Sequence, residues 1–285
     1  MNSEQKDRKL FSLELFPPKT EQGMEKLQEH VKRLTRIDPL YISVTFGAGG
    51  STQQRTFQCV EWLVSEGIEA APHISCISST SEEIIGMLQR YKEQGIQRLV
   101  ALRGDAPSGA GPVGRGELNH ANELVTLIRQ EFGDRFHIEV AAYPEVHPQA
   151  ANASVDLQNF KRKVEAGADA AITQYFYNPD AYFHFVDSCR DQGIEIPIVP
   201  GIMPITNYSN LSRFSDACGA EIPRWIRKRL EAYADDVDSI RAFGVEVVSE
   251  LCQRLLDGGA PGLHFYTMNQ SAAVLKIWDN LGLTD

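Results

Sequence analysis

The most constraining feature of this 285-residue chain is a regular alternation of short apolar runs with longer helical patterns. Apolar runs typical of buried strands occupy 10–16, 41–46, 70–75, 98–102, 137–141, 170–173, 197–200 and 262–265. Strands that alternate with helices pair in parallel, because each helix carries the chain back to the same end of the sheet. Eight such units predict one closed (β/α)8 barrel, an α/β fold of the TIM type, with a doubly wound open sheet as the alternative.

Helical periodicity fills the intervals between these runs. The clearest helix is expected at 81–94, where Thr80 and Glu83 form a capping box and Ile84, Leu88 and Tyr91 repeat at helical spacing. Further helices are expected near 21–36, 52–66, 118–131, 154–166, 179–191, 209–217, 237–257 and 270–281. No repeat or linker separates the units, so a single barrel domain is expected over residues 1–285.

Charge and cysteine content exclude several classes of protein. The chain has 38 acidic and 28 basic residues, a net charge of −10, which argues against non-specific binding to nucleic acid or to anionic membranes. Its five cysteines are scattered without a C-x-x-C pair, so neither a disulfide framework nor a structural zinc site is predicted. The polar N-terminus lacks an apolar signal core, and no apolar run is long enough to span a membrane, which predicts a cytoplasmic protein.

Polar side chains gather where the expected strands end. In a (β/α)8 barrel these ends face one pocket. At them stand Glu14, Thr45, His73, the Arg103-Gly104-Asp105 turn, Tyr143 and Gln174. Strand alternation turns Glu14 away from its apolar neighbours and into the barrel. Desolvation there should raise its pKa and suit it to general-acid work; a salt-bridged structural glutamate is the alternative.

The expected helix at 154–166 carries a polar arc beside its apolar stripe, made of Asp156, Asn159, Arg162 and Lys163. Such an arc near a pocket mouth suits a ribose and a diphosphate, and a plain solvent-exposed face is the alternative. His147 lies in no metal-ligand spacing, so no metal site is predicted.

Taken together, ten segments resemble the methylenetetrahydrofolate reductase family. They occur in the family's order, cover nearly the whole chain, and read LELFPPK (13–19), SVTFGA (43–48), AAPHISC (70–76), VALRGD (100–105), AAYPEVHP (141–148), NFKRK (159–163), AGAD (166–169), ITQ (172–174), PGIMP (200–204) and HFYTMN (264–269). The length resembles the short bacterial type, a catalytic barrel without a regulatory domain.

The resemblance implies a flavoprotein of one-carbon metabolism and methionine biosynthesis. It implies non-covalently bound FAD and ping-pong chemistry, in which NADH or NADPH gives a hydride to the flavin and leaves. 5,10-Methylenetetrahydrofolate then takes the hydride and becomes 5-methyltetrahydrofolate. The resemblance also implies a homo-oligomer, and it does not decide between the two nucleotides.

Roles are implied residue by residue. Glu14 resembles the acid that protonates the folate N10, and Asp105 the aspartate near flavin and pterin. FAD-contacting positions are matched by Thr45, Phe46, Ala48, His73, Arg103, Gly104, Asp105, His120, Ala121, Tyr143, His147, Asp156, Asn159, Arg162 and Lys163. Substrate-binding positions are matched by Glu14, Asp105, Gln174, Tyr208, Tyr266 and Gln270.

Three of these positions depart from the family pattern. His120 stands where a tyrosine is often found, and Tyr208 where phenylalanine is often found. Gln270 replaces the arginine that holds the folate's glutamate tail, and an amide cannot form a charge-assisted pair with a carboxylate. The hypothesis is weaker tail binding, or use of another base such as Lys276.

Three other functions stay open at this point. The first is a flavin or nicotinamide barrel oxidoreductase that acts on a non-folate substrate. The second is a metal-dependent lyase or hydrolase, for which the chain lacks a ligand cluster. The third is a non-enzymatic scaffold, which would not need Glu14, Asp105 and Gln174 together.

Overall fold

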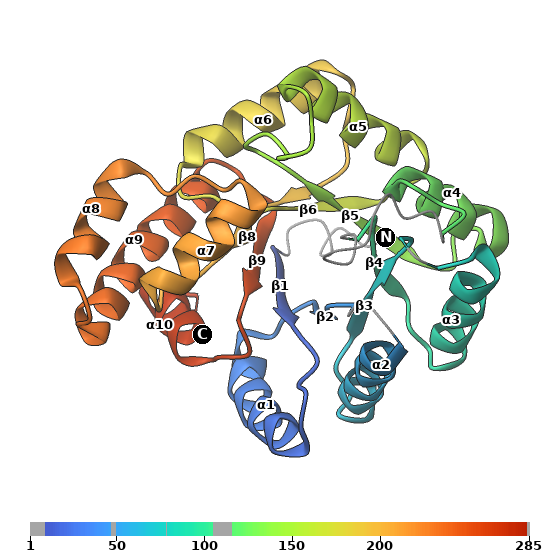
Figure 1. Ribbon diagram of the computed structural model, residues 1–285, viewed down its shortest axis with the longest axis horizontal. Coiled ribbons are helices and arrows are strands. Elements are labelled where there is room, and N and C mark those ends of the chain that lie inside the picture. The colour runs from blue at the N-terminus through green and yellow to red at the C-terminus, as the bar shows by residue number, and fades with distance from the viewer. Residues whose placement is uncertain (1–8, 47–49, 78, 105–115, 284–285) are drawn as a thin grey trace.

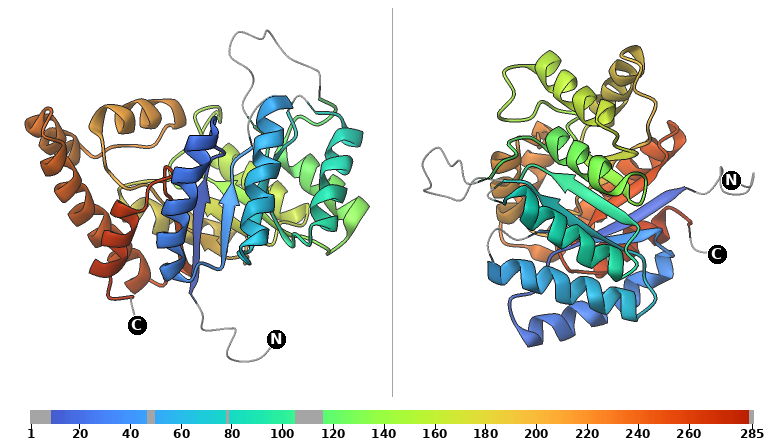
Figure 2. Two further views of the ribbon diagram at one scale, coloured as in Figure 1. Left: turned by 90° about the horizontal axis from the view of Figure 1, so that it is seen from below. Right: turned by 90° about the vertical axis from the view of Figure 1, so that its right-hand side faces the viewer.

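Parallel strands at the centre and helices around them form a barrel in this computed structural model (Figure 1). The structure describes residues 9–46, 50–77, 79–104 and 116–283. The strands are β1 Leu10–Leu15, β2 Tyr41–Val44, β3 Ala70–Ser75, β4 Arg98–Leu102, β5 His137–Ala142, β6 Ala170–Thr173, β7 Ile198–Val199, β8 Gly201–Ile202 and β9 Gly262–Tyr266. All pair in parallel in the order β7-β6-β5-β4-β3-β2-β1-β9-β8. Figure 2 shows β1 and β2 running side by side in one direction.

The first and last strands in this order, β7 and β8, are consecutive in the sequence. β7 pairs with β6 and β8 pairs with β9, and only Pro200 separates β7 from β8. Proline has no N–H for a ladder, while its carbonyl still accepts from the His264 N–H at 3.0 Å. The barrel therefore closes through residues 198–202, which confirms the expected barrel. The expected seventh strand at 197–200 is corrected to two short strands flanking this proline.

The helices follow the expected alternation, with one addition. They are α1 Glu21–Leu34, a 3-10 turn η2 Thr35–Ile37, α2 Gly50–Ser65, α3 Ser81–Glu93, α4 Ala121–Phe132, α5 Ala153–Glu165, α6 Pro179–Asp191, α7 Tyr208–Cys218, α8 Arg224–Tyr233, α9 Val237–Asp257 and α10 Ala272–Asn280. The capping box of α3 is present, because Glu83 N–H donates to Thr80 Oγ1 and Thr80 N–H donates to Glu83 Oε2. Helix α8, which lies outermost beside α9, was not expected (Figure 1).

Apolar side chains bury in two separate layers. Outward-facing strand residues such as Leu13 and Leu15 pack against the helices in the larger cluster. A smaller cluster fills part of the barrel interior with Tyr41, Ala71, Val100 and Ile172. Buried polar side chains, among them Ser12, Glu139 and His264, occupy other positions of the interior.

Two features are absent from the residues that the structure describes. No described helix is long and apolar enough to cross a membrane. No group of three potential metal ligands occurs in the part of the chain that the structure describes. All five cysteines are free thiols, four of them buried.

Candidate active site

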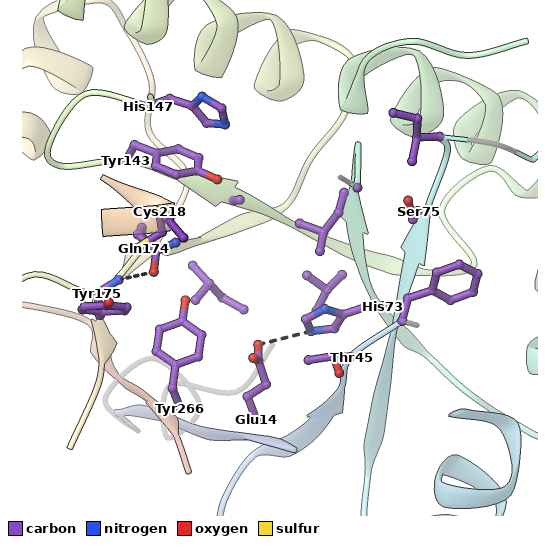
Figure 3. A pocket seen from close by; sticks show the side chains of 18 of the residues that line it. Glu14, Thr45, His73, Ser75, Tyr143, His147, Gln174, Tyr175, Cys218 and Tyr266 are labelled. Atoms are coloured by element: carbon purple, nitrogen blue, oxygen red, sulfur yellow. Dashed lines mark hydrogen bonds and ion pairs between the residues drawn. The ribbon is translucent and has the colours of Figure 1, made fainter. Parts of the chain in front are cut away.

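A cavity of about 1370 Å³ opens at the carboxyl ends of the strands (Figure 3). Its floor is apolar, with Val100, Leu102 and Ile172. Of the candidate residues predicted from the sequence, it is lined by Glu14, Thr45, Phe46, His73, Gly104, Tyr143, His147, Gln174 and Tyr266. Seven different strands or the loops after them therefore converge as the barrel expectation required.

Glu14 sits against two imidazoles at one side of this cavity. Its Oε2 lies 3.4 Å from Nε2 of His73 and 3.6 Å from Nε2 of His264, and its side chain keeps 19% of its surface exposed. Burial raises the pKa of Glu14, but the close ring N–H groups and the charge of His264 and His73 outweigh burial and lower that pKa to about 2. The expected raised pKa is thus wrong for the ligand-free protein, because sequence spacing did not show the two histidines.

His264 is a site residue that the sequence reasoning missed. The Ser12 hydroxyl lies 2.8 Å from its Nδ1, which turns Nε2 toward Glu14. Both residues pair with each other in register between β1 and β9. The usable signal was strand alternation, because His264 shares a face with Tyr266, which was predicted.

Tyr266 and Gln174 are held at the opposite wall from His73 (Figure 3). Tyr266 Oη donates to the Thr173 carbonyl at 2.7 Å, and Gln174 Oε1 accepts from the Tyr175 N–H at 3.0 Å. A Cβ on Gly201 would lie 2.1 Å from the Thr173 carbonyl oxygen. The glycine therefore allows this close approach between β6, β8 and β9.

The turn after β4 is shaped by a second glycine. Gly104 has a φ of +84°, and a Cβ there would lie 1.9 Å from Ser75 Oγ. Ser75 instead donates to the Arg103 carbonyl at 2.9 Å, which ties the ends of β3 and β4 together. The Arg103 guanidinium, outside the cavity lining, donates at 2.6 Å to Oε1 of Gln149, which lines the cavity.

The loop after β5 carries two rings over the cavity. Tyr143 and His147 pack edge to face at 4.4 Å between ring centroids (Figure 3). Asp156 of α5 accepts from the His147 N–H at 2.9 Å and so fixes the loop. Lys163 turns inward to the Ala141 carbonyl, and burial lowers its pKa to about 8 although Asp156 acts in the opposite direction.

Several predicted residues lie away from the cavity lining. On α5, Asn159 and Arg162 are exposed and bonded to each other at 2.8 Å. The others are Arg103, Asp156 and Lys163, whose contacts are given above, His120, which caps α4, Ala121, Tyr208 at the start of α7, and the exposed Gln270. Ala48 and Asp105 lie outside the described residues.

Comparisons with known proteins show the family of this chain. The family model of methylenetetrahydrofolate reductase matches residues 1–282. This chain belongs to the methylenetetrahydrofolate reductase family. The family is one of oxidoreductases, so the chain is an enzyme of that class.

Relatives in the family differ in length. The 5,10-methylenetetrahydrofolate reductase of Escherichia coli is 38% identical over 273 residues, which span 95% of this chain and 90% of that protein. Methylenetetrahydrofolate reductase (NADH) 1 of Arabidopsis thaliana is 39% identical over 96% of this chain but only 48% of its own length. The match therefore spans nearly all of the bacterial protein and about half of the plant protein.

A solved structure shares the fold. It is an uncharacterized protein from Clostridium thermocellum described as binding two copies of 5-methyl-5,6,7,8-tetrahydrofolic acid. It aligns with a TM-score of 0.66 and 19% identity, covering 98% of this chain and 95% of its own.

Proposed function

We propose that this protein reduces 5,10-methylenetetrahydrofolate to 5-methyltetrahydrofolate with a hydride from NADH or NADPH that passes through bound FAD. Membership in the reductase family supports the folate reaction. The single structural observation that carries the proposal is one barrel-end cavity in which a carboxylate stands against two imidazoles.

The shape and chemistry of the cavity fit a flavin with a second ligand above it. A single drug-sized ligand fills roughly 300–1000 Å³, and this cavity is larger, at about 1370 Å³. The absence of a side chain at Gly104 lets the end of β4 pack closely against Ser75 in the cavity wall. Thr45, Tyr143 and His147 offer polar atoms around the apolar floor. When bound, FAD supplies the two-electron carrier that links the two substrates.

Glu14 is the proposed acid for the folate N10. Because the pKa of Glu14 is about 2 in the free site, its carboxyl is ionised there. Acid catalysis then requires that a proton move from an imidazole to Oε2 before it reaches N10. Burial favours this move, since burial alone raises the pKa of the carboxyl.

The remaining proposed roles concern orientation. Gln174 and Tyr266 stand where they can contact the ring system of either substrate, and Tyr143 and His147 close the site from above (Figure 3). Lys163 and Asp156 support the floor and the loop of the flavin site from behind. Asp105, which lies outside the described residues, is proposed to bind the pterin.

An anaerobic visible spectrum of the purified protein tests this function. We expect a yellow protein that bleaches with NADH or NADPH and recolours on addition of methylenetetrahydrofolate, which also decides the nucleotide. Bleaching without recolouring would move the substrate to another class. A colourless protein that takes up no added FAD would contradict the proposal.

A further inference from the structure

The barrel interior beneath Glu14 is polar and charged. Barrels of this class are usually filled by layers of bulky branched side chains. Here Ser12, Tyr41, Arg98, Glu139 and His264 occupy the interior, and all but Arg98 are almost completely buried. Burying such groups costs free energy unless they are paired, so their collection in one layer calls for a function.

These five side chains form a row through the barrel interior, called the file below. The upper half of the file connects Tyr41 to Glu14. In the sheet register, Ser12 of β1 pairs with Tyr41 of β2 on one side and with His264 of β9 on the other. The Ser12 hydroxyl is 2.8 Å from His264 Nδ1, and the Tyr41 and His264 rings are 6.3 Å apart. His264 Nε2 then faces Glu14 at 3.6 Å.

The lower half connects Tyr41 to Glu139. The Arg98 guanidinium lies 4.7 Å from the centre of the Tyr41 ring and donates to Glu139 Oε1 at 2.7 Å. Burial and the charge of Glu139 raise the pKa of Tyr41, against the effect of Ser12 and Arg98. Within the described residues, Tyr41 Oη, Glu139 Oε2 and His264 Nε2 are all buried without a hydrogen-bond partner. A buried donor on Tyr41 and a buried acceptor on Glu139 thus stand unused.

The file reaches solvent at the end of the barrel away from the cavity. Arg98 and His137 are the first residues of β4 and β5 and pair in register. His137 Nε2 lies 3.9 Å from Glu139 Oε1, and its side chain is 38% exposed. Glu69, also partly exposed, faces Arg98 at 3.7 Å.

We propose that this file carries protons from solvent at the amino end of the barrel to Glu14, through His137, Glu139, Tyr41, Ser12 and His264. This inference rests on the proposed function, in which Glu14 gives one proton to the folate in each turnover. NAD(P)H, methylenetetrahydrofolate and one proton give NAD(P)⁺ and methyltetrahydrofolate, so one proton must be replaced each time. A ligand that fills the cavity keeps water away from Glu14 on that side.

The transfer balances along the file. His264 gives its Nε2 proton to Glu14 Oε2 and takes one at Nδ1 from Ser12, and a turn of the imidazole ring restores the starting tautomer before the next turnover. Ser12 takes the hydroxyl proton of Tyr41, which takes one from Glu139, and Glu139 is reprotonated from His137 or solvent. Arg98 keeps its protons and positions Glu139 and the Tyr41 ring. His73 and Tyr266 also face Glu14 but lead away from the file.

Tyr41→Phe breaks the file by removing one oxygen atom. The matched control is Tyr91→Phe, because Tyr91 Oη is also buried without a partner in the described structure but lies on α3, stacked on Phe57 outside the barrel. We expect Tyr41→Phe to slow reoxidation of the reduced flavin by methylenetetrahydrofolate at least about tenfold. Its reduction by NAD(P)H should be unchanged, and Tyr91→Phe should change neither rate.

A second measurement needs neither cofactor nor turnover. Imidazole nitrogen NMR of the ligand-free protein should show an altered titration of His264 in Tyr41→Phe and an unaltered one in Tyr91→Phe. Equal folate half-reaction rates in the wild type and both variants, with identical His264 titrations, would overturn the proton path alone. A wild-type protein that never passes electrons to folate would instead overturn the proposed function.

Discussion

The Nε2 atoms of His73 and His264 approach the same carboxylate oxygen of Glu14, at 3.4 and 3.6 Å. The two imidazoles come from β3 and β9, on either side of the β1 residue that they flank. This arrangement explains why a carboxyl in a desolvated position has a pKa of about 2. It also means that the protonation of Glu14 is controlled by its neighbours rather than by solvent.

The acid stability of the protein should depend on this arrangement. A carboxyl whose pKa falls from 4.5 to about 2 on folding stabilises the fold above pH 4.5. That stabilisation is lost as the pH falls from 4.5 toward 2, because the unfolded chain binds the proton first. Urea unfolding across this range should show a smaller pH dependence in Glu14→Gln than in the wild type. The exposed Glu66→Gln is the control, and equal curves for Glu14→Gln and wild type would contradict the assignment.

Gly104→Ala should destabilise the fold and the flavin site together. The new Cβ would meet a left-handed φ and the Ser75 hydroxyl, which together cost about 2 kcal/mol or more. Gly133→Ala is the matched control, since its φ is also positive, at +57°, but no atom lies within 4 Å of its Cβ. Thermal unfolding should show the larger loss for Gly104→Ala. An equal loss in both variants would show that the contact with Ser75 is of no consequence.

Asp156→Asn should speed the release of flavin. The carboxylate accepts from the His147 N–H, and a charged acceptor holds that loop more firmly than an amide does. Flavin fluorescence after dilution measures the release rate. Asp187→Asn, an exposed position on α6, should release flavin at the wild-type rate. No difference between the two variants would remove Asp156 from the flavin site.

Gln270→Arg should lower the KM for methylenetetrahydrofolate roughly tenfold with little change in kcat, because a charge-assisted hydrogen bond is worth about 1.5–3 kcal/mol. Gln270 is exposed, and its N–H donates to the Thr267 carbonyl at 2.9 Å, so a longer side chain has room. Lys276→Ala tests whether that lysine already holds the tail, in which case it raises KM. An unchanged KM in Gln270→Arg would contradict the weaker-tail hypothesis.

Local sequence signals predicted those elements of the barrel well that do not depend on distant parts of the chain. Three strands, 70–75, 98–102 and 170–173, have the bounds expected from their apolar runs, and the α3 capping box is as expected. The sequence pattern placed Pro200 at the end of a strand. In the structure it separates two short strands, β7 and β8, through which the barrel closes. Helix α8 was missed because only Ile226 and Leu230 are buried in a segment dominated by charge.

The site was predictable in its membership but not in its electrostatics. Strand ends identified Glu14, His73, Tyr143 and Gln174 as neighbours in one cavity. The pKa of Glu14 depends on which side chain faces it from β9, a strand about 250 positions later in the chain. No local pattern reports such a contact. The exposed positions of Asn159 and Arg162 likewise depend on how α5 is rotated against the barrel.

The most direct test of the account compares the two half-reactions in Glu14→Gln by anaerobic stopped-flow absorbance. We expect flavin reduction by NAD(P)H within about twofold of the wild-type rate, since Glu14 has no part in it. Reoxidation by methylenetetrahydrofolate should fall by about 10²-fold or more, the usual contribution of a general acid. If the flavin of the Glu14→Gln variant is reoxidised by methylenetetrahydrofolate at the wild-type rate, the assignment of Glu14 as the acid is contradicted.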